Sequence, residues 1–356
     1  MGAMENEAYV QDALRLLEQL IATPSVSREE TKAADVMEQA LRDYGLEPCR
    51  EGNNLWTTAP GYDASRPTLL LNAHVDTVKP VVTWTRDPFR PEVIDGRLYG
   101  LGANDCGGGL VSLLQAFRLL SAKPQPYNLI YLVSAEEEVS GANGISRVLP
   151  LLPPVDVAIV GEPTSMQPAI AEKGLMVIDG VAHGVSGHAA RREGVNAIDI
   201  ALDDIAWLRR HTFPNASPLL GATQATVTII HAGTQHNVIP DRCEFTIDAR
   251  TNEFYRNEEL FEYLQQHMKS ELHARSYRLQ SSRIDPSHPL VRRCVSMGMT
   301  PFGSPTLSDQ ALMSWPSLKL GPGESARSHS ADEFICIEEI EQAVQVYMTL
   351  LDQLKL

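Results

Sequence analysis

The sequence predicts an α/β protein in which a mostly parallel sheet with helices on both faces is interrupted by an inserted α+β domain. Helical and extended patterns alternate over the first 170 or so residues, which is typical of a parallel sheet. From about Lys173 the order changes to strand, helix, strand, strand, helix, strand, and the α/β pattern returns after about residue 283. We therefore expect a discontinuous catalytic domain, residues 1–172 and 283–356, around an insert at 173–282.

In the first segment, helical patterns at 6–23, 109–122 and 144–152 alternate with apolar extended runs at 68–78, 128–138 and 155–163. Such runs predict strands that are buried on both faces. An amphipathic helix is expected at 337–356, at the end of the chain.

The insert shows strands at 174–187, 223–233, 242–250 and 275–282, with helices at 197–211 and 257–272. This βαββαβ order is ferredoxin-like, and such a unit folds on its own and can therefore be inserted into another domain.

Composition excludes several functions. The chain has 356 residues with 30 Lys and Arg against 45 Asp and Glu, a net charge of −15, which argues against nucleic acid and anionic membranes as partners. Five scattered cysteines without a CxxC pair predict neither a disulfide framework nor a thiolate zinc site. Neither a secretory signal nor a membrane span is found in the sequence, so we expect a cytoplasmic protein.

The stretch "LLLNAHVDTV" ends an apolar strand with His74 and Asp76. Residues two apart in a strand point to the same face, and open α/β sheets form ligand crevices at the carboxyl ends of their strands. A carboxylate beside an imidazole either orients a metal-binding histidine or forms an ordinary buried hydrogen bond. This stretch alone leaves both interpretations open.

Other acidic and histidine residues also follow strands or lie in loops. Asp105 lies in "YGLGANDCGGG", whose spacing does not fit a dinucleotide loop and whose carboxylate would repel phosphate. Three adjacent carboxylates in "SAEEEVSG" repel one another unless a cation or solvent lies among them. Singly, each residue has an ordinary explanation as a helix cap, a solvated helix start or surface. Together, two histidines and these carboxylates suit a pair of Zn²⁺ or similar ions; the set is His74, Asp105, Glu136, Glu137, Glu138, Glu162 and His329.

The ordered motifs "HVDTV", "GANDCGGG", "SAEEEVSG", "GEPT", "GHAA" and "SHSADEF" resemble the M20 family of co-catalytic metallohydrolases over nearly the whole chain. The resemblance implies two divalent metals, Zn²⁺ with Co²⁺ as a functional substitute. One would be held by His74 and Glu162 and the other by Glu137 and His329, with Asp105 between them. It also implies that Asp76 orients His74 and that Glu136 is the general base.

In the insert, the resemblance makes His188 a donor to the substrate oxyanion that reaches across from the partner subunit of a homodimer formed through 173–282. Asn237 and Arg250 match positions that hold the substrate carboxylate, for which the guanidinium fork is suited. A turn residue and a strand-edge ion pair are the alternatives for these two.

Leu101, Cys106 and Gly107 depart from the residues common in the family. Cys106 follows a proposed ligand, so it either binds metal itself or packs as a buried thiol beneath the loop.

The expected activity is that of a zinc-dependent amidohydrolase acting on an N-acyl amino acid, foremost N-acetylornithine deacetylation in arginine biosynthesis. Desuccinylation of N-succinyl-ornithine, -citrulline or -diaminopimelate, and dipeptide or carboxypeptide cleavage, are the enzymatic alternatives. An inactive amino-acid-binding homologue is the alternative of another class.

Overall fold

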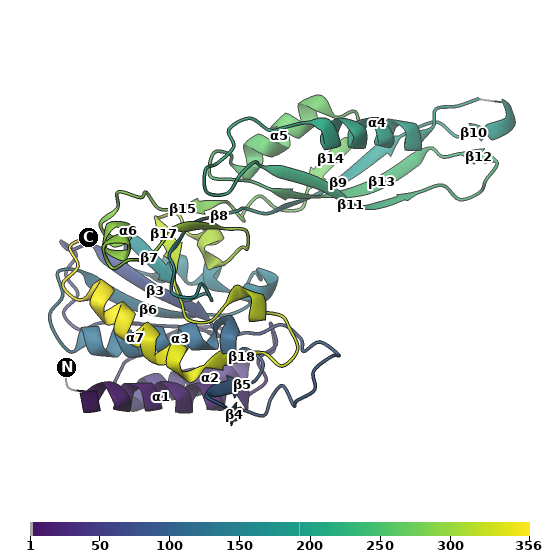
Figure 1. Cartoon of the computed structure of the whole chain (residues 1–356). Coiled ribbons are helices and arrows are strands. Elements are labelled where there is room, and N and C mark those ends of the chain that lie inside the picture. The colour runs from purple at the N-terminus through teal and green to yellow at the C-terminus, as the bar shows by residue number, and fades with distance from the viewer. Residues whose placement is uncertain (1–2, 192) are drawn as a thin grey trace. The chain divides into compact units, whose positions relative to one another are not determined.

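The computed structural model describes residues 3–191 and 193–356. The chain forms two compact units (Figure 1). Unit 1 comprises the chain up to Ile170 together with Ile284–Phe302 and Ser308–Leu356, and unit 2 comprises Ala171–Arg283 and Gly303–Leu307. Each unit has its own sheet and core and is described separately.

The centre of the unit 1 sheet is parallel. Its strands lie in the order β6 (Asn128–Ser134), β3 (Thr68–His74), β7 (Val157–Val160) and β17 (Ser317–Lys319), all parallel to their neighbours. Antiparallel strands extend both sides: β2 (Asn54–Thr58) and β1 (Cys49–Glu51) beyond β6, and β8 (Ala169–Glu172) beyond β17. Every residue of β3, β6 and β7 is buried, as expected for parallel strands covered on both faces.

Three helices pack together against one face of this sheet: α1 (Ala3–Ile21), α3 (Gly108–Ser121) and α7 (Ile337–Leu351) (Figure 1). The other face is covered by short 3₁₀ segments and the side chains beside them, including Ile145, Val148 and Trp315. Two further helices complete unit 1, namely α2 (Thr31–Asp43) and α6 (Pro289–Ser296). A small antiparallel sheet lies apart, in the order β18 (Phe334–Cys336), β5 (Arg97–Tyr99), β4 (Glu92–Ile94).

The prediction of a single helix at 144–152 is wrong. The chain instead forms two 3₁₀ segments, η3 (Ile145–Arg147) and η4 (Leu149–Leu151). Pro150 occupies the first turn of η4, and proline supplies no backbone N–H to continue a longer α-helix. Ile145 and Val148 still reach the core, which is why the apolar spacing resembled that of a helix.

Unit 2 has the predicted βαββαβ order. Its elements are β9 (Met176–His183), α4 (Ala197–Arg210), β11 (Gln224–Ala232), β13 (Arg242–Arg250), α5 (Asn257–His267) and β14 (Glu271–Ala274), and the antiparallel strands are arranged β11-β13-β9-β14. Its core includes Ile178, Phe245 and Leu264. Two short strands, β10 (Gly187–His188) and β12 (Val238–Ile239), pair at the end of the sheet where β9 finishes and β13 begins.

The last strand of unit 2 lies earlier in the chain than the expected 275–282. Helix α5 already ends at His267, and β14 covers Glu271–Ala274. Leu272 and Ala274 are buried and alternate with exposed residues, as in a strand with one face on the core. The strand therefore includes residues 271 and 272, which were expected to end the helix. Residues 282–283 form the short β15, which pairs with the end of β8, and β16 (Phe302–Ser304) also pairs with β8.

Among the helices of the described chain, none is both long and apolar enough to span a bilayer.

Candidate metal centre

The carboxyl ends of three parallel strands bring the predicted ligands of unit 1 together. β3 ends at His74, which pairs in register with Ser134 at the end of β6. The glutamates at 136–138 follow β6, and Glu162 follows β7. Because parallel strands end at the same edge of a sheet, side chains from distant parts of the sequence meet there.

His74 is buried and faces three carboxylates. Its Nε2 atom lies 3.3 Å from Asp105 Oδ1, 3.8 Å from Glu162 Oε1 and 4.0 Å from Glu137 Oε2. Its Nδ1 atom lies 2.9 Å from the backbone carbonyl oxygen of Asp76. A carbonyl only accepts, so Nδ1 donates, and Nε2 is left as the ring atom that faces the carboxylates and that a metal ion would take as its ligand.

The Asp76 carboxylate contributes to the site in a way that the sequence did not indicate. Its Oδ1 is 3.6 Å from His74 Nδ1, farther than the backbone carbonyl of the same residue. The carboxylate instead accepts hydrogen bonds from the backbone N–H groups of Glu137 and Glu138, at 3.0 and 3.2 Å, and from Ser27 Oγ at 2.7 Å. Asp76 therefore fixes the turn that carries these glutamates as well as the histidine.

A second group forms on the other side of Asp105. His329 Nε2 is 2.8 Å from Glu138 Oε2 and 3.6 Å from Asp105 Oδ2. Asp105 thus directs one oxygen to each histidine, which is the arrangement of a carboxylate bridging two cations. Ligand atoms of His74, Asp105 and Glu138 all lie within 4.8 Å of one another.

The surroundings of Glu136 and Glu137 differ from those that their expected roles suggest. Both Glu136 oxygens are held by Asn143, through its backbone N–H at 3.2 Å and its side-chain amide at 3.0 Å. The structure brings Glu137 and Glu138 to the ligand group in its place. The backbone of Glu136 is left-handed (φ 53°, ψ 24°) and a 3₁₀ turn, η2 (Glu137–Val139), follows, so the alternation of the strand stops at this residue.

Without a bound cation, the cluster would hold more carboxylates than it can ionise. Burial, with repulsion from Asp105, raises the pKa of Glu162 to about 8, and burial likewise raises the pKa of Glu137 well above its ordinary value. The hydrogen bond to Glu138 raises the pKa of His329 to about 9. One Glu162 oxygen is buried without a hydrogen-bond partner. Buried carboxylates of this kind are stabilised by a coordinated cation, which displaces the protons, so the residues fit the divalent metals.

The loop that carries Asp105 is fixed by a residue which the sequence analysis did not single out. The buried Glu333 accepts hydrogen bonds from the backbone N–H groups of Asn104 and Asp105, at 2.8 and 2.9 Å. Asn104 in turn donates to the carbonyl oxygen of Glu324 at 3.0 Å. These bonds set the position of the Asp105 carboxylate.

The unit 2 candidates lie at two different ends of its sheet. His188 and Asn237 are exposed and neighbouring, since His188 pairs with Val238 and the backbone N–H of Ala189 donates to Asn237 O. Arg250 ends β13, which begins near β12 at Arg242. The eight residue-to-residue steps from Arg242 to Arg250 span about 27 Å of extended strand. One chain therefore places Asn237 and Arg250 far apart along its sheet, and their shared role in holding the substrate carboxylate stays a prediction.

The surroundings of Arg250 match its alternative interpretation as a member of a strand-edge ion pair. Its guanidinium forms two hydrogen bonds to Asp248, at 2.7 and 3.0 Å. The nearest acidic partner of Arg250 is therefore a residue of its own strand.

Comparison with known proteins identifies a family and several relatives of this chain. The model of Peptidase family M20/M25/M40 matches residues 70–353. Succinyl-diaminopimelate desuccinylases from Xylella fastidiosa and Verminephrobacter eiseniae are each 29% identical, covering 97% and 96% of this chain and 99% and 96% of their own.

Solved structures share the fold. A tripeptidase from Staphylococcus aureus superposes with a TM-score of 0.75 at 22% identity, over 96% of this chain and 97% of its own. A dinuclear metal-binding peptidase from Bacillus subtilis gives 0.74 at 18% identity, over 97% and 98%. With the family match extending across both units, the chain belongs to peptidase family M20/M25/M40.

Proposed function

We propose that this protein is a dinuclear metal-dependent amidohydrolase that removes an N-succinyl group from an amino acid. The convergence of His74, Asp105, Glu138, Glu162 and His329 at one sheet edge is the observation that carries the proposal. The desuccinylases named above match this chain along nearly their full length. Desuccinylation is therefore better supported than N-acetylornithine deacetylation in arginine biosynthesis, which these relatives do not specifically support.

We assign one divalent ion to His74 and Glu162 and the other to Glu138 and His329, with Asp105 between them. Imidazole and carboxylate ligands suit Zn²⁺, and Co²⁺ is a reasonable substitute. The Bacillus subtilis neighbour is described as binding a dinuclear metal, which supports this number of ions. When bound, such ions polarise the amide carbonyl and acidify the attacking water.

Glu137 is assigned as the general base in place of Glu136. It lies 4.0 Å from His74 Nε2, close to the proposed ions, whereas Glu138 is already paired with His329. Burial raises the pKa of Glu137, and this higher proton affinity would suit its ionised carboxylate to take a proton from water and pass it to the departing amine.

Substrate contacts from unit 2 are assigned to two chains. Arg250 and His188 lie at opposite ends of the unit 2 sheet, so a small substrate can meet both only if one comes from a second copy. β11 is an edge strand on which Ile229 and Ile230 are about half exposed, at 48% and 46%. An exposed apolar edge strand favours pairing with another chain, which supports a homodimer formed through unit 2.

A product-release assay tests the proposed function. N-succinyl and N-acetyl forms of ornithine, citrulline and diaminopimelate, and a set of dipeptides, would be incubated with the enzyme and added Zn²⁺ or Co²⁺. We expect the highest kcat/KM for an N-succinyl substrate. A preference for N-acetyl substrates would restore the deacetylase assignment, and cleavage of dipeptides alone would contradict both.

A further inference from the structure

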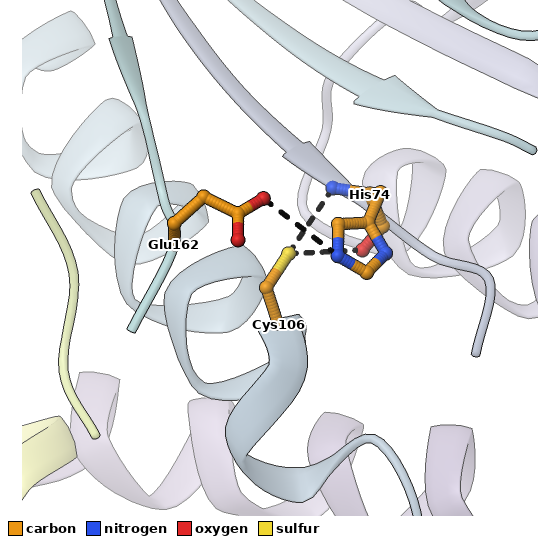
Figure 2. Close-up of side chains that lie close together, drawn as sticks. All are labelled: His74, Cys106 and Glu162. Carbon is orange, nitrogen blue, oxygen red and sulfur yellow. Dashed lines mark hydrogen bonds and ion pairs between the residues drawn. The ribbon is translucent and has the colours of Figure 1, made fainter. Parts of the chain in front are cut away.

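A sulfur atom lies among the proposed ligands of one metal. Cys106 follows Asp105 directly and is 1% exposed. Its Sγ, a ring nitrogen of His74 and a carboxylate oxygen of Glu162 all lie within 4.8 Å of one another, and all three residues are buried. Figure 2 shows the thiol hydrogen-bonded to the backbone of His74 and the Glu162 carboxylate directed toward the imidazole.

Burial raises the pKa of the Cys106 thiol, so the thiolate would form only as a metal displaces its proton. The hydrogen bonding around the sulfur suits that form. The backbone N–H of His74 donates to Sγ at 3.2 Å, and a donor at this place stabilises negative charge on sulfur. The contact from Sγ to His74 O is longer, at 3.4 Å, and thiols are weak donors. Loss of the thiol proton would therefore remove the weaker of the two contacts.

The Glu162 carboxylate gives an independent indication of a ligand. Glu162 is 9% exposed, and its Oε1 has no hydrogen-bond partner although it lies 3.8 Å from His74 Nε2. In tetrahedral zinc sites, the metal–ligand bond lengths place nitrogen and oxygen ligands about 3.4 Å apart and sulfur and nitrogen ligands about 3.6 Å apart. A contraction of a few tenths of an ångström between Glu162 and His74 would reach the first spacing.

We propose that Cys106 is a ligand of the metal held by His74 and Glu162. The inference rests on the dinuclear centre proposed above and adds that its two halves differ chemically: one contains sulfur, and the half with Glu138 and His329 contains only nitrogen and oxygen. Binding replaces the S–H bond with a metal–sulfur bond, and the proton passes to solvent. The first half therefore selects thiophilic ions such as Zn²⁺, Co²⁺ and Cd²⁺, and the second accepts Mn²⁺ or Mg²⁺ more readily.

Titration of the metal-free, full-length protein with Co²⁺ tests the assignment without an activity measurement. We expect a sulfur-to-cobalt charge-transfer band in the near ultraviolet, which nitrogen and oxygen ligands alone do not produce. The band should be absent in Cys106→Ser and retained in Cys294→Ser, because Cys294 is also a buried free thiol of unit 1 but lies on α6. Cd²⁺ affinity should fall at least about tenfold in Cys106→Ser, since even outer-shell changes cost that much.

The outcomes of this titration separate the Cys106 assignment from the dinuclear centre on which it rests. Wild-type protein that binds two Co²⁺ ions without the band, or a band that persists in Cys106→Ser, overturns the Cys106 assignment and leaves the dinuclear centre standing. Wild-type protein that binds no Co²⁺ contradicts the dinuclear centre itself and this inference with it. If Cys106→Ser does not fold, the wild-type spectrum still decides between a thiolate ligand and a packed thiol.

Discussion

The carboxyl edge of the unit 1 sheet and the β10–β12 end of unit 2 both carry residues expected in one active site, yet their surroundings differ. His74 and Glu162 are buried and each already faces other members of the site. His188 and Asn237 are exposed, and their hydrogen bonds recorded in the structure are to the backbone of adjacent residues. We therefore expect unit 1 to supply the metal ligands from within one chain, and the unit 2 residues to need a second surface to become functional.

The largest expected effect separates two adjacent glutamates. Glu137→Gln should lower kcat by roughly 10²- to 10⁴-fold, the usual contribution of a general base, while both metals stay bound. Glu136→Gln should change kcat by less than about tenfold, because Asn143 holds the Glu136 side chain away from the ligand group. Steady-state kinetics with metal analysis of both variants measures this, and the reverse ranking would restore Glu136 as the general base.

Removing a histidine from unit 1 should lower the metal content, whereas removing one from unit 2 should not. His74→Ala should weaken metal binding by at least about tenfold and lower the metal content after dialysis, because it deletes a ligand. His188→Ala should leave the metal content unchanged, since every proposed ligand belongs to unit 1. Metal analysis by mass spectrometry would compare the two variants. Equal metal loss from both would contradict a centre built from unit 1 alone.

A mixture of inactive chains tests whether the exposed end of unit 2 is completed by a second copy. Glu137→Gln and His188→Ala chains would be unfolded, mixed in equal amounts and refolded together. Half of randomly formed dimers are mixed and each mixed dimer contains one intact composite site, so about a quarter of wild-type activity should return. If mixed dimers form, as a size tag on one chain would reveal, but activity stays absent, His188 does not act across the interface.

The smallest expected effect is a pH dependence of stability that belongs to the unit 1 centre. In the metal-free protein the pKa of Glu162 is raised from 4.5 to about 8 and that of His329 from 6.5 to about 9. In both cases the folded state holds more protons than the unfolded chain, so the free energy of unfolding falls as pH rises from about 4.5 to about 9.

Denaturant unfolding of metal-free protein across this range measures the slope. Glu162→Gln should reduce the fall in the free energy of unfolding with rising pH, because glutamine does not titrate. Each tenfold difference in proton affinity between the folded and unfolded states corresponds to about 1.4 kcal/mol. Zn²⁺ should flatten the wild-type curve because it displaces the protons. Stability that rises between pH 5 and pH 8 in metal-free wild-type protein would contradict the crowded carboxylate centre.

How far the sequence could predict the molecule differs between the same two regions. Buried apolar strands ending in His74 and Glu162 follow from hydrophobic patterning, and a parallel arrangement brings such ends together. The resemblance to M20 enzymes added the expected ligand set. The order of the glutamates could not be predicted from residue type, because three identical side chains stand together and the left-handed turn at Glu136 decides which of them reach His74 and His329.

In unit 2, the element order was predictable but the placement of side chains was not. The alternation of β13 indicated a strand, whereas the separation of Arg250 from Asn237 depends on the register with β9 and on the position of β12. Two elements were also predicted wrongly because a local feature of the chain outweighed its apolar pattern. Pro150 divided one expected helix, and the inward alternation of Leu272 and Ala274 placed the last strand earlier than its apolar pattern suggested.

The most direct test of the central claim is turnover of an N-succinyl amino acid by protein stripped of metal, measured together with the number of ions bound per chain on restoration. The ligand set of unit 1 predicts negligible turnover without metal, recovery with Zn²⁺ or Co²⁺, and full activity near two ions per chain. Full turnover by protein shown to contain no metal would contradict the assignment of this sheet edge as a dinuclear hydrolytic centre.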